Sequence, residues 1–271
     1  MARRRKQELL GNHQKCYLWG KNVVWETLRA GRWPILELRV SETLPREKLA
    51  EVRRLAESRD IPLLVESPDE LQRRCRSPEH QGLVAKMPPF PYDDIDTVLS
   101  QMNASPLFLV LDSIHDPHNF GAILRSAEAL GVDAVFVAMR KQSDVTSVVA
   151  RSSAGAVNNV RLCKVDSLVE LAKRLRAMDV TLVAASEKGT RGPWEFDFRR
   201  PTAIVIGNEG QGISRALFEQ CTDVVTIPQQ GTIGSLNAAV SAGIVLYEAA
   251  RQRRGTAQPP KAESRSNARG R

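Results

Sequence analysis

Short apolar runs alternate with helical patterns through the second half of this 271-residue sequence. The first run, LFLVLD at 107–112, is apolar at nearly every position, so both of its faces must be covered. Further runs of this kind lie at 134–138, 159–163, 180–185, 203–207 and 224–227. Amphipathic helical patterns, such as the one at 166–178, separate them. Strands that are apolar on both faces and separated by helices are typical of a parallel sheet, so this half is predicted to be an α/β domain.

The first third of the chain predicts a separate, smaller α/β unit. Helical patterns lie at 17–30 and 45–58, and strand patterns lie at 35–40, 62–65 and 82–85. Ser67 is the expected N-cap of a further short helix. The proline-rich segment MPPFP at 87–91 then breaks all periodicity, which marks a linker. The predicted organisation is a basic disordered arm at 1–15, the small unit at 16–88, a linker at 89–104, the sheet domain at 105–251 and a basic disordered tail at 252–271.

The positive charge of the sequence is concentrated at its two ends. The formal net charge is +8, and residues 1–15 alone carry five basic residues against one acidic residue. Residues 251–271 carry seven basic residues against one, within a stretch rich in Gly, Pro and Ser. Such arms are expected to be disordered and suit non-specific contacts with the phosphates of a nucleic acid. A solubilising tail is the alternative.

Other sequence features argue against several classes of protein. No apolar run approaches the length of a membrane span, so none is expected. The N-terminus lacks the apolar core of a secretory signal, and its arginine run is short for a mitochondrial presequence, which favours a cytoplasmic protein. The four cysteines have no metal-ligand spacing and are expected to be reduced, buried thiols: Cys16, Cys75, Cys163 and Cys221.

Three strand ends carry polar or glycine-rich loops, and ligands of open α/β sheets bind outside the carboxyl ends of strands. The first loop follows the strand at 107–112 and leads into a helix that carries Asn119 and Arg125. Asn119 is a plausible N-cap, and capping alone would explain it. A surface ion pair would likewise explain Arg125. A metal site is a weaker alternative, built from the acidic and histidine side chains of the same loop: Asp112, His115, Asp116 and His118.

The second loop, at 207–212, reads GNEGQG. Its glycine order, G-x-x-G-x-G, differs from that of the dinucleotide-binding motif, and it lacks the Lys and the Ser or Thr of a phosphate-binding loop. Asn208 and Glu209 between the glycines indicate that the backbone approaches a ligand closely. A plain turn from strand to helix is the alternative.

The third loop lies within the stretch 224–248, VVTIPQQGTIGSLNAAVSAGIVLYE. Pro228 ends a short β-branched strand, and two glycines follow in the loop. Ser235 is expected to cap the next helix, whose apolar residues cover most of its circumference and predict burial on nearly every side. Asn237, in the first turn of that helix, needs a polar partner, which could be a ligand, the chain itself or a second subunit.

Together, these three segments resemble the three sequence motifs of the SpoU (TrmH-type) RNA 2′-O-ribose methyltransferases. The matching residues are, in order, Asn119, Gly121 and Arg125, then IGNEGQG at 206–212, then the stretch from Ile227 to Glu248. The match covers residues 105–250. The small unit also resembles that family's ribosomal-protein-like RNA-binding domain, including HQGLVA at 80–85. Within the family, the sequence most resembles the guanosine 2′-O-methyltransferases of large-subunit (23S) ribosomal RNA.

The resemblance implies a fold that periodicity alone would not suggest. The family has a knotted, SPOUT-type α/β domain in which the C-terminal chain passes through a loop to form a trefoil knot, although knots are very rare. It implies S-adenosyl-L-methionine as the cofactor, contacted here by Gly207, Ile227 and Leu236. It also implies RNA, ribosomal in this branch, as the substrate, no metal, and a homodimer in which Arg125 of one chain approaches the site of the other.

The chemistry implied by the family requires alignment more than activation. The sulfonium of the cofactor is an activated methyl donor, so the protein must align it with a ribose 2′-oxygen and exclude water. The hydroxyl proton must be accepted, or the developing alkoxide stabilised. Arg125 is interpreted as an electrostatic stabiliser and phosphate clamp rather than a base, because a guanidinium stays protonated. The remaining catalytic candidates hold the geometry: Asn119, Glu209, Ser235 and Asn237.

The sequence leaves two alternatives. The same chemistry could act on transfer RNA or on another ribosomal site, although the N-terminal unit favours ribosomal RNA because the transfer-RNA branch of the family typically lacks it. The chain could also be a catalytically silent RNA-binding or ribosome-assembly protein. The joint presence of Asn119, Arg125, Glu209 and Asn237 argues against silence.

Overall fold

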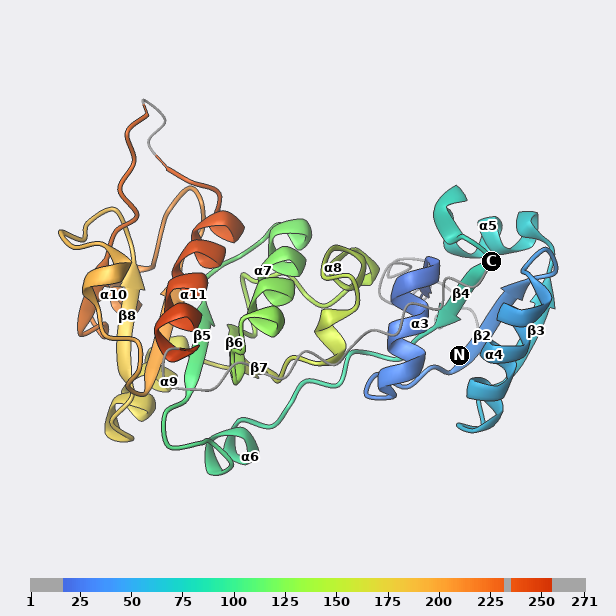
Figure 1. Cartoon of the computed structure of the whole chain (residues 1–271), viewed down its shortest axis with the longest axis horizontal. Coiled ribbons are helices and arrows are strands. Elements are labelled where there is room, and N and C mark those ends of the chain that lie inside the picture. Colours follow the sequence, from blue (N-terminus) through green and yellow to red (C-terminus); the bar gives the residue numbers. More distant parts are fainter. Residues whose placement is uncertain (1–16, 232–234, 255–271) are drawn as a thin grey trace, which may run out of the picture.

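The computed structural model describes residues 17–231 and 235–254, and these residues form two α/β domains, each with its own sheet (Figure 1). The predicted basic arm at 1–15, Cys16 and the basic tail from residue 255 onward lie outside the described residues. No helix within the described ranges is long and apolar enough to cross a membrane.

The N-terminal domain has a four-stranded mixed sheet in the order β1-β4-β2-β3. Strands β2 and β3 are parallel, whereas β4 runs antiparallel to both of its neighbours. Its strands are β1 (Tyr17–Trp19), β2 (Glu37–Ser41), β3 (Leu63–Glu66) and β4 (Leu83–Lys86). Its helices are α3 (Lys21–Ala30), α4 (Arg46–Glu57), α5 (Pro68–Cys75) and the short 3₁₀ helix η1 (Pro78–His80). The predicted helix at 17–30 therefore begins later, because its first residues form β1.

Ser67 caps α5, as predicted from the sequence. Its hydroxyl accepts a hydrogen bond from the amide of Glu70, and the Glu70 carboxylate accepts one from the Ser67 amide in return. Pro68 occupies the first helical position, where its missing N–H costs nothing. This reciprocal capping box fixes the residue at which the helix begins.

A network of charged side chains lies across β2 and β3, and we call it the Glu66 network. The Glu66 carboxylate accepts hydrogen bonds from the guanidinium groups of Arg39 and Arg74, the latter at 2.9 Å. Arg39 also donates to Glu37 at 2.8 Å. The side chains of Glu66 and Arg39 are only 11% and 10% exposed, so both are largely removed from water. Each of these charges has a partner of opposite sign inside the same domain, which offsets the cost of burying it.

The second domain is built around a six-stranded sheet in which all neighbouring strands are parallel. The strand order is β10-β8-β9-β5-β6-β7, so β9 and β5 lie at the centre. The strands are β5 (Leu107–Leu111), β6 (Ala134–Ala138), β7 (Leu162–Val165), β8 (Thr181–Ala185), β9 (Thr202–Ile206) and β10 (Asp223–Val225). Strands β5 and β9 are buried at every position, as predicted for a parallel sheet covered on both faces.

Helices cover this sheet, and apolar side chains form a separate core on each of its faces. Along β5, Leu109 belongs to one core while Phe108 belongs to the other, because successive side chains of a strand point to opposite faces. The helices are α6 (Ile95–Ser100), α7 (Pro117–Ala129), α8 (Ser147–Ser152), α9 (Leu168–Ala177), α10 (Arg215–Phe218) and α11 (Ala238–Arg254), with the 3₁₀ turns η2 (Ala156–Asn158) and η3 (Pro193–Glu195). Helix α7 packs against both α8 and α11.

The start of α7 differs from the predicted one. Asn119 does not cap this helix, because Asp116 is the N-cap and its carboxylate accepts a hydrogen bond from the amide of His118 at 2.9 Å. Pro117 occupies the first helical position, and its fixed φ favours a helix start there. Asn119 consequently lies inside the first turn, and its side chain is available for contacts outside the helix.

The cap of α11 is also a correction to the sequence prediction. The helix begins at Ala238, so Ser235 lies outside it and does not cap it. Asn237 provides the cap, since its side-chain oxygen accepts hydrogen bonds from the amides of Ala239 and Val240 at 2.9 and 3.3 Å. Asparagine is among the residues that perform this role best.

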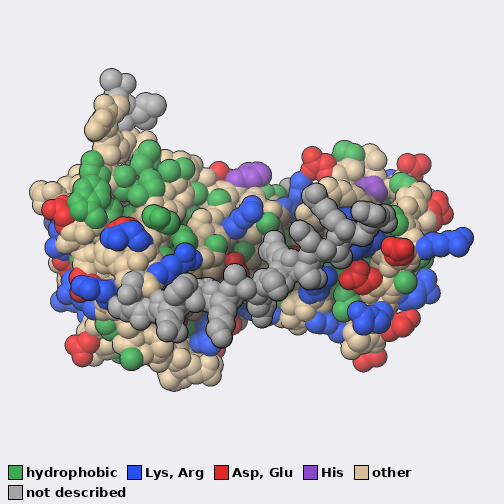
Figure 2. Space-filling view, viewed as in Figure 1, with side chains coloured by type: hydrophobic (Ala, Val, Ile, Leu, Met, Phe, Trp, Pro, Cys, Tyr) green, Lys and Arg blue, Asp and Glu red, His purple; other side chains and the backbone are tan. Residues whose placement is uncertain are grey.

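The expectation that α11 is buried on nearly every side is wrong for the single chain. Val240, Ile244 and Tyr247 are 50%, 40% and 61% exposed, and their spacing places them along one side of the helix. We call these three residues the α11 stripe. Figure 2 shows apolar side chains gathered at the surface over this part of the second domain. Sequence periodicity reports that this face is apolar, but not whether it is covered within one chain.

The segment expected to be a linker is packed between the two domains. Within 89–104 the chain forms α6, and just before it Phe90 is buried with its ring edge-on to Trp33 of the first domain. Asp93 makes a parallel bridge to Cys163 of the edge strand β7. The segment therefore continues the second sheet by one short pairing while its aromatic ring stays in the core of the first domain.

Polar contacts also join the two domains directly. The Arg32 guanidinium of the first domain donates to the carboxylate of Asp93 at 2.5 Å and to the main-chain oxygen of Val160. The side-chain amide of Asn158 donates to the hydroxyl of Thr27 at 3.0 Å, and both of these side chains are buried. Buried polar groups that are paired across an interface resist separation, because opening would leave them unpaired.

Candidate functional site

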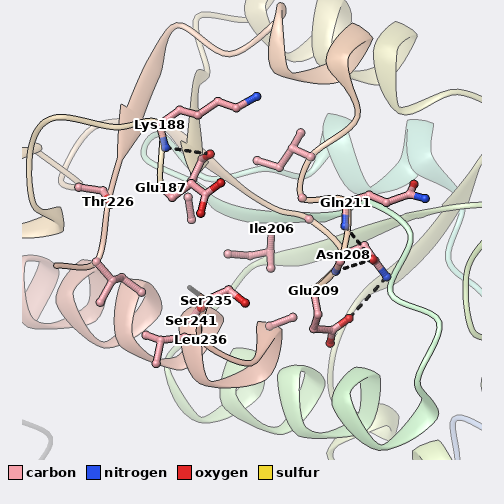
Figure 3. Close-up of a pocket in the computed structure, with 18 of the residues that line it drawn as sticks. Glu187, Lys188, Ile206, Asn208, Glu209, Gln211, Thr226, Ser235, Leu236 and Ser241 are labelled. Atoms are coloured by element: carbon pink, nitrogen blue, oxygen red, sulfur yellow. Dashed lines mark hydrogen bonds between the residues drawn. The ribbon is translucent and has the colours of Figure 1, made fainter. Parts of the chain in front are cut away.

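A cavity of about 350 Å³ lies at the carboxyl ends of β8, β9 and β10 (Figure 3). The residues that line it come mainly from four segments that are distant in the sequence: 185–188, 206–213, 225–229 and 235–241. These segments converge because the carboxyl ends of parallel strands lie at the same edge of a sheet. A cavity of this size suits a small-molecule ligand.

The cavity combines apolar walls with polar groups at a few positions. Apolar residues that line it include Ile206, Ile227 and Leu236. Glu187 and Glu209 present carboxylates to it (Figure 3). This mixture is typical of sites that bury an organic ligand and orient it through a small number of polar contacts. The three predicted cofactor residues all line the cavity: Gly207, Ile227 and Leu236.

Position 207 accepts only glycine. A Cβ atom there would lie 2.2 to 2.4 Å from backbone atoms of Gly212 and Ile213, which no side chain could avoid. Two backbone hydrogen bonds between Asn208 and Gly212, at 3.0 and 2.8 Å, close the same turn. Gly212 has a φ of +67°, a conformation that favours glycine. The turn therefore folds tightly on itself and brings main-chain groups to the cavity wall.

Three of the predicted catalytic side chains form one hydrogen-bonded chain, which we call the site network. The side-chain amide of Asn237 donates to the side-chain oxygen of Asn119 at 3.0 Å. The amide of Asn119 donates in turn to the Glu209 carboxylate at 2.5 Å. These residues come from the cap of α11, the first turn of α7 and the loop after β9. The structure therefore brings together the three strand ends that the sequence analysis singled out.

The helix cap determines the direction of these hydrogen bonds. The oxygen of Asn237 accepts from the first amides of α11, so its NH₂ group faces Asn119. Asn119 then accepts with its oxygen and donates with its nitrogen. Glu209 ends the network as an acceptor at the cavity wall, and its other polar contact within residues 17–231 and 235–254 is a long one of 3.5 Å from the Asn208 amide. Acceptor capacity at Glu209 is therefore left for a ligand.

Arg125 lies apart from the cavity in the single chain. Its side chain is exposed on α7 and does not line the cavity. It forms no hydrogen bond or ion pair with any other residue in 17–231 or 235–254. The expectation that it completes the site of a second chain stays a prediction.

Ser235 lines the cavity next to Leu236, two residues before the cap of α11 (Figure 3). The three residues that precede it, 232–234, belong to the predicted third loop but lie outside the described residues. A geometric role for Ser235 stays a prediction as well.

The sequence analysis gave no role at this site to the turn after β8, which lines the cavity, or to Asp112, which binds the residue after the lining residue Ile213. The turn after β8, including Glu187 and Lys188, lines the cavity. Its signal in the sequence was its position directly after the apolar run at 180–185. Asp112, considered only as a metal ligand, is 7% exposed and accepts a hydrogen bond from the amide of Ser214 at 2.8 Å. A carboxylate that directly follows a buried strand was the signal in that case.

Three of the four side chains of the alternative metal site are engaged elsewhere. Asp116 caps α7, Asp112 accepts from Ser214, and His118 lies 3.2 Å from the hydroxyl of Ser152. In the part of the chain that the structure describes, no group of three or more His, Cys, Asp or Glu side chains is arranged to hold a metal ion. The sequence alternative of a metal site in this loop therefore has no structural support.

Comparison with known proteins gives matches for both domains. Residues 106–247 match the model of the SpoU rRNA methylase family, and residues 17–93 match a model described as RNA 2′-O ribose methyltransferase substrate binding. Among curated proteins, an uncharacterized tRNA/rRNA methyltransferase of Mycolicibacterium gilvum is 37% identical over 261 residues, which is 93% of this chain and 83% of that protein.

Solved structures give matches over most of the chain. The SpoU methyltransferase AviRb of Streptomyces viridochromogenes, crystallised with the cofactor AdoMet, is 31% identical with a TM-score of 0.75, covering 88% of this chain and 90% of that one. The TrmH/SpoU tRNA-modifying enzyme of A. aeolicus is also 31% identical, with a TM-score of 0.51, covering 58% of this chain and 80% of that one. The match to AviRb confirms the predicted fold class, a knotted parallel-sheet α/β methyltransferase domain preceded by a small α/β domain.

Proposed function

This chain belongs to the SpoU rRNA methylase family, and we propose that it methylates the ribose 2′-oxygen of a guanosine in 23S ribosomal RNA. It is an RNA methyltransferase, and its cofactor is S-adenosylmethionine. The observation that carries the proposed 2′-O chemistry is the site network, because Asn237 and Asn119 hold Glu209 as an open acceptor at the wall of the cavity. A group of this kind can orient a hydroxyl.

The residues of the cavity fit the cofactor. Ile206, Ile227 and Leu236 offer apolar surface for its ring system, and the turn at Gly207 offers main-chain groups to its polar edges. When bound, S-adenosylmethionine supplies an activated methyl group on a positively charged sulfonium. We therefore assign Gly207, Ile227 and Leu236 to cofactor binding.

The site network positions the reacting hydroxyl in this proposal. Glu209 accepts a hydrogen bond from the ribose 2′-hydroxyl. This contact holds the hydroxyl proton at the carboxylate and directs the ribose oxygen toward the cavity. Asn119 and Asn237 fix Glu209 from the other side, and the first amides of α11 anchor them. Ser235 adds a hydroxyl to the same wall.

We also propose a homodimer in which Arg125 of one chain completes the site of its partner. Arg125 is exposed and unpaired among the described residues, although it lies on the same helix as Asn119. Helix α7 packs against α11, whose exposed stripe of apolar side chains is the kind of surface that a second subunit covers (Figure 2). A guanidinium brought to the partner's cavity would stabilise the negative charge that develops on the ribose oxygen.

The N-terminal domain favours ribosomal RNA as the substrate. Residues 17–93 match a substrate-binding model, and the tRNA-modifying enzyme of A. aeolicus covers only 58% of this chain whereas AviRb covers 88%. A site on transfer RNA is the second candidate, since the relative in M. gilvum is named a tRNA/rRNA methyltransferase. The intact site network disfavours a catalytically silent RNA-binding protein.

The proposal is tested with the purified protein, labelled S-adenosylmethionine and separate samples of unmodified 23S, 16S and transfer RNA. Methylated positions are mapped by their resistance to alkaline cleavage, which requires a free 2′-hydroxyl. The expected result is one modified guanosine in 23S ribosomal RNA. Modification of transfer RNA alone would favour the second candidate, and methyl groups on bases would overturn the 2′-O chemistry. Cofactor binding without transfer to any RNA would support the silent alternative.

A further inference from the structure

Besides the backbone hydrogen bond from the amide of Asp112 to the oxygen of Ile206, at 2.9 Å, the carboxyl ends of β5 and β9 are joined by two side-chain hydrogen bonds of opposite direction, which we call the loop clip. The Asp112 carboxylate, directly after β5, accepts a hydrogen bond from the amide of Ser214 at 2.8 Å. The side-chain amide of Asn208, two residues after β9, donates to the main-chain oxygen of Ser113 at 3.0 Å. Each loop therefore holds the other at one point.

On the β5 side of the clip, Ser113 has a backbone conformation that is unusual for a residue with a side chain. Asp112 is 7% exposed, and its second oxygen accepts from the hydroxyl of Ser113 at 3.0 Å. Ser113 has a φ of +63°, in the left-handed region that a residue with a side chain rarely adopts. Local strain of this kind persists only where the surroundings determine it, and it is concentrated at functional sites.

Asn208 has a second set of hydrogen bonds that does not depend on the clip. Its side-chain oxygen accepts from the amides of Gly210 and Gln211 at 2.8 and 3.2 Å, which closes the turn that lines the cavity (Figure 3). The oxygen of this one side chain therefore shapes the cofactor turn. Its nitrogen donates to Ser113 at 3.0 Å and reaches Glu209 only at 3.5 Å, so its main role is to attach that turn to the loop that leads into α7.

We propose that Asn208 and Asp112 are positioning residues for methyl transfer, because the loop clip sets the separation between Glu209 and Asn119. Glu209 follows Asn208 directly, and Asn119 lies in the first turn of the helix that follows the β5 loop. The clip thereby orients the site network relative to the cofactor turn. This inference rests on the proposed function, since it assigns roles within the same site.

Asn208→Ser separates the two roles of this side chain. A serine hydroxyl can still accept from the amides of the turn, but it is too short to donate to Ser113, and it adds no charge. The turnover number of RNA methylation is expected to fall about 10- to 100-fold, because small misplacements of reacting groups carry penalties of this order. The dissociation constant of S-adenosylmethionine, measured by calorimetry, is expected to change by less than about threefold, because the turn stays closed.

The other side of the clip offers a conservative rescue. Asp112→Asn keeps an acceptor for the amide of Ser214, so its turnover is expected to stay within about threefold of the wild type. Asp112→Ala removes the acceptor and is expected to lose as much turnover as Asn208→Ser. Equal losses in the asparagine and alanine variants would show that the charge of Asp112, and not the clip, is what matters.

Amide hydrogen exchange of the free protein tests the clip without any activity measurement. Exchange of the segments 112–118 and 207–214 is expected to be about tenfold faster in Asn208→Ser and Asp112→Ala, since each loses one of the bonds between the loops. The matched control is Asn103→Ala, which removes a hydrogen bond of 2.7 Å to Asp133 near the amino end of β5. Unchanged exchange in both clip variants would overturn the proposal.

A double-mutant cycle tests whether Asn208 acts through Glu209. In a Glu209→Ala background, Asn208→Ser is expected to lower turnover by less than about twofold, because the network that it positions is already absent. A further tenfold loss in that background would contradict the proposal. So would parallel losses of turnover and cofactor affinity in Asn208→Ser alone. Absence of methylation by the wild type would instead count against the proposed function, and hydrogen exchange would still decide on the clip.

Discussion

The Glu66 network and the site network are each built around one carboxylate, but they satisfy that carboxylate in different ways. Glu66 is bound by two guanidinium groups inside the N-terminal domain. Glu209 accepts from the neutral amide of Asn119 and faces a cavity. The first network is closed, because its charges are matched by opposite charges. The second is open, because acceptor capacity remains at its end. The difference predicts that the closed network serves stability and the open one serves chemistry.

Glu209→Ala is the variant expected to have the largest effect on activity. The turnover number should fall about 100- to 1,000-fold, as for the loss of a group that acts on the reacting oxygen. The melting temperature should change little, because Glu209 has no cationic partner among the described residues. Glu219→Ala is the control, since the one partner of that exposed carboxylate in the described part of the chain is Arg215 on α10. A fall in melting temperature with little change in turnover would reverse the comparison.

Arg125→Ala should lower turnover about 100-fold. The open network has no positive charge of its own, and the substitution removes the one that the partner chain is proposed to supply. Cofactor affinity should be nearly unchanged, since Arg125 does not line the cavity of its own chain. The matched control is Arg176→Ala, on the exposed side of α9.

Mixing two inactive variants sharpens this prediction. A dimer that contains one Arg125→Ala chain and one Glu209→Ala chain has one intact site if Arg125 acts on the partner. An equal mixture that exchanges subunits should therefore recover about a quarter of wild-type activity. No recovery after subunit exchange would place Arg125 in its own chain's site instead.

Glu66→Gln should have a smaller effect, and on stability alone. Replacing the carboxylate leaves Arg74 without a full counter-charge and removes one of the two carboxylates that pair with the largely buried Arg39. The free energy of unfolding in urea should fall by about 1 to 3 kcal/mol. Turnover at saturating RNA should stay at the wild-type value. A large loss of turnover with unchanged stability would mean that the network contacts RNA.

The pH dependence of stability gives the smallest and most specific effect. Burial alone would raise the pKa of Glu66, but the hydrogen bonds and charges of Arg74 and Arg39 outweigh it and lower the pKa below its ordinary value of 4.5. A carboxylate whose pKa is lower in the folded state contributes stability above its unfolded pKa and loses it as the pH falls through its folded pKa. Urea unfolding of the wild type should therefore weaken more steeply below about pH 5 than that of Glu66→Gln. Parallel curves would contradict this assignment.

The strands were the part of the fold that the sequence predicted best. Strand β6 was predicted at 134–138 and is found at those residues, and the parallel arrangement followed from runs that are apolar on both faces. Helix starts were less predictable, because several capping residues lie close together. Asp116, followed by Pro117, caps α7 in place of the predicted Asn119. Asn237 caps α11 in place of the predicted Ser235.

The candidate site was predictable as three converging loops, but not in its internal bonding. Strand-end positions and glycine spacing indicated which loops would meet. The bond between Asp112 and Ser214 joins residues 102 positions apart, so no local pattern contains it. The exposure of Tyr247 and the rest of the α11 stripe could not be predicted either. A helix face covered by a second subunit and one covered by the core of its own chain have the same apolar periodicity.

The packed segment between the domains bears on how a target is chosen. Phe90, Arg32 and Asn158 connect the substrate-binding domain to the methyltransferase domain, and these contacts favour one spacing between the two domains. We therefore expect a nucleotide to reach the cavity only where the folded RNA spans that spacing. We expect the enzyme to recognise the three-dimensional structure of the RNA around its target nucleotide. Short unstructured oligonucleotides of the right sequence should therefore be poor substrates.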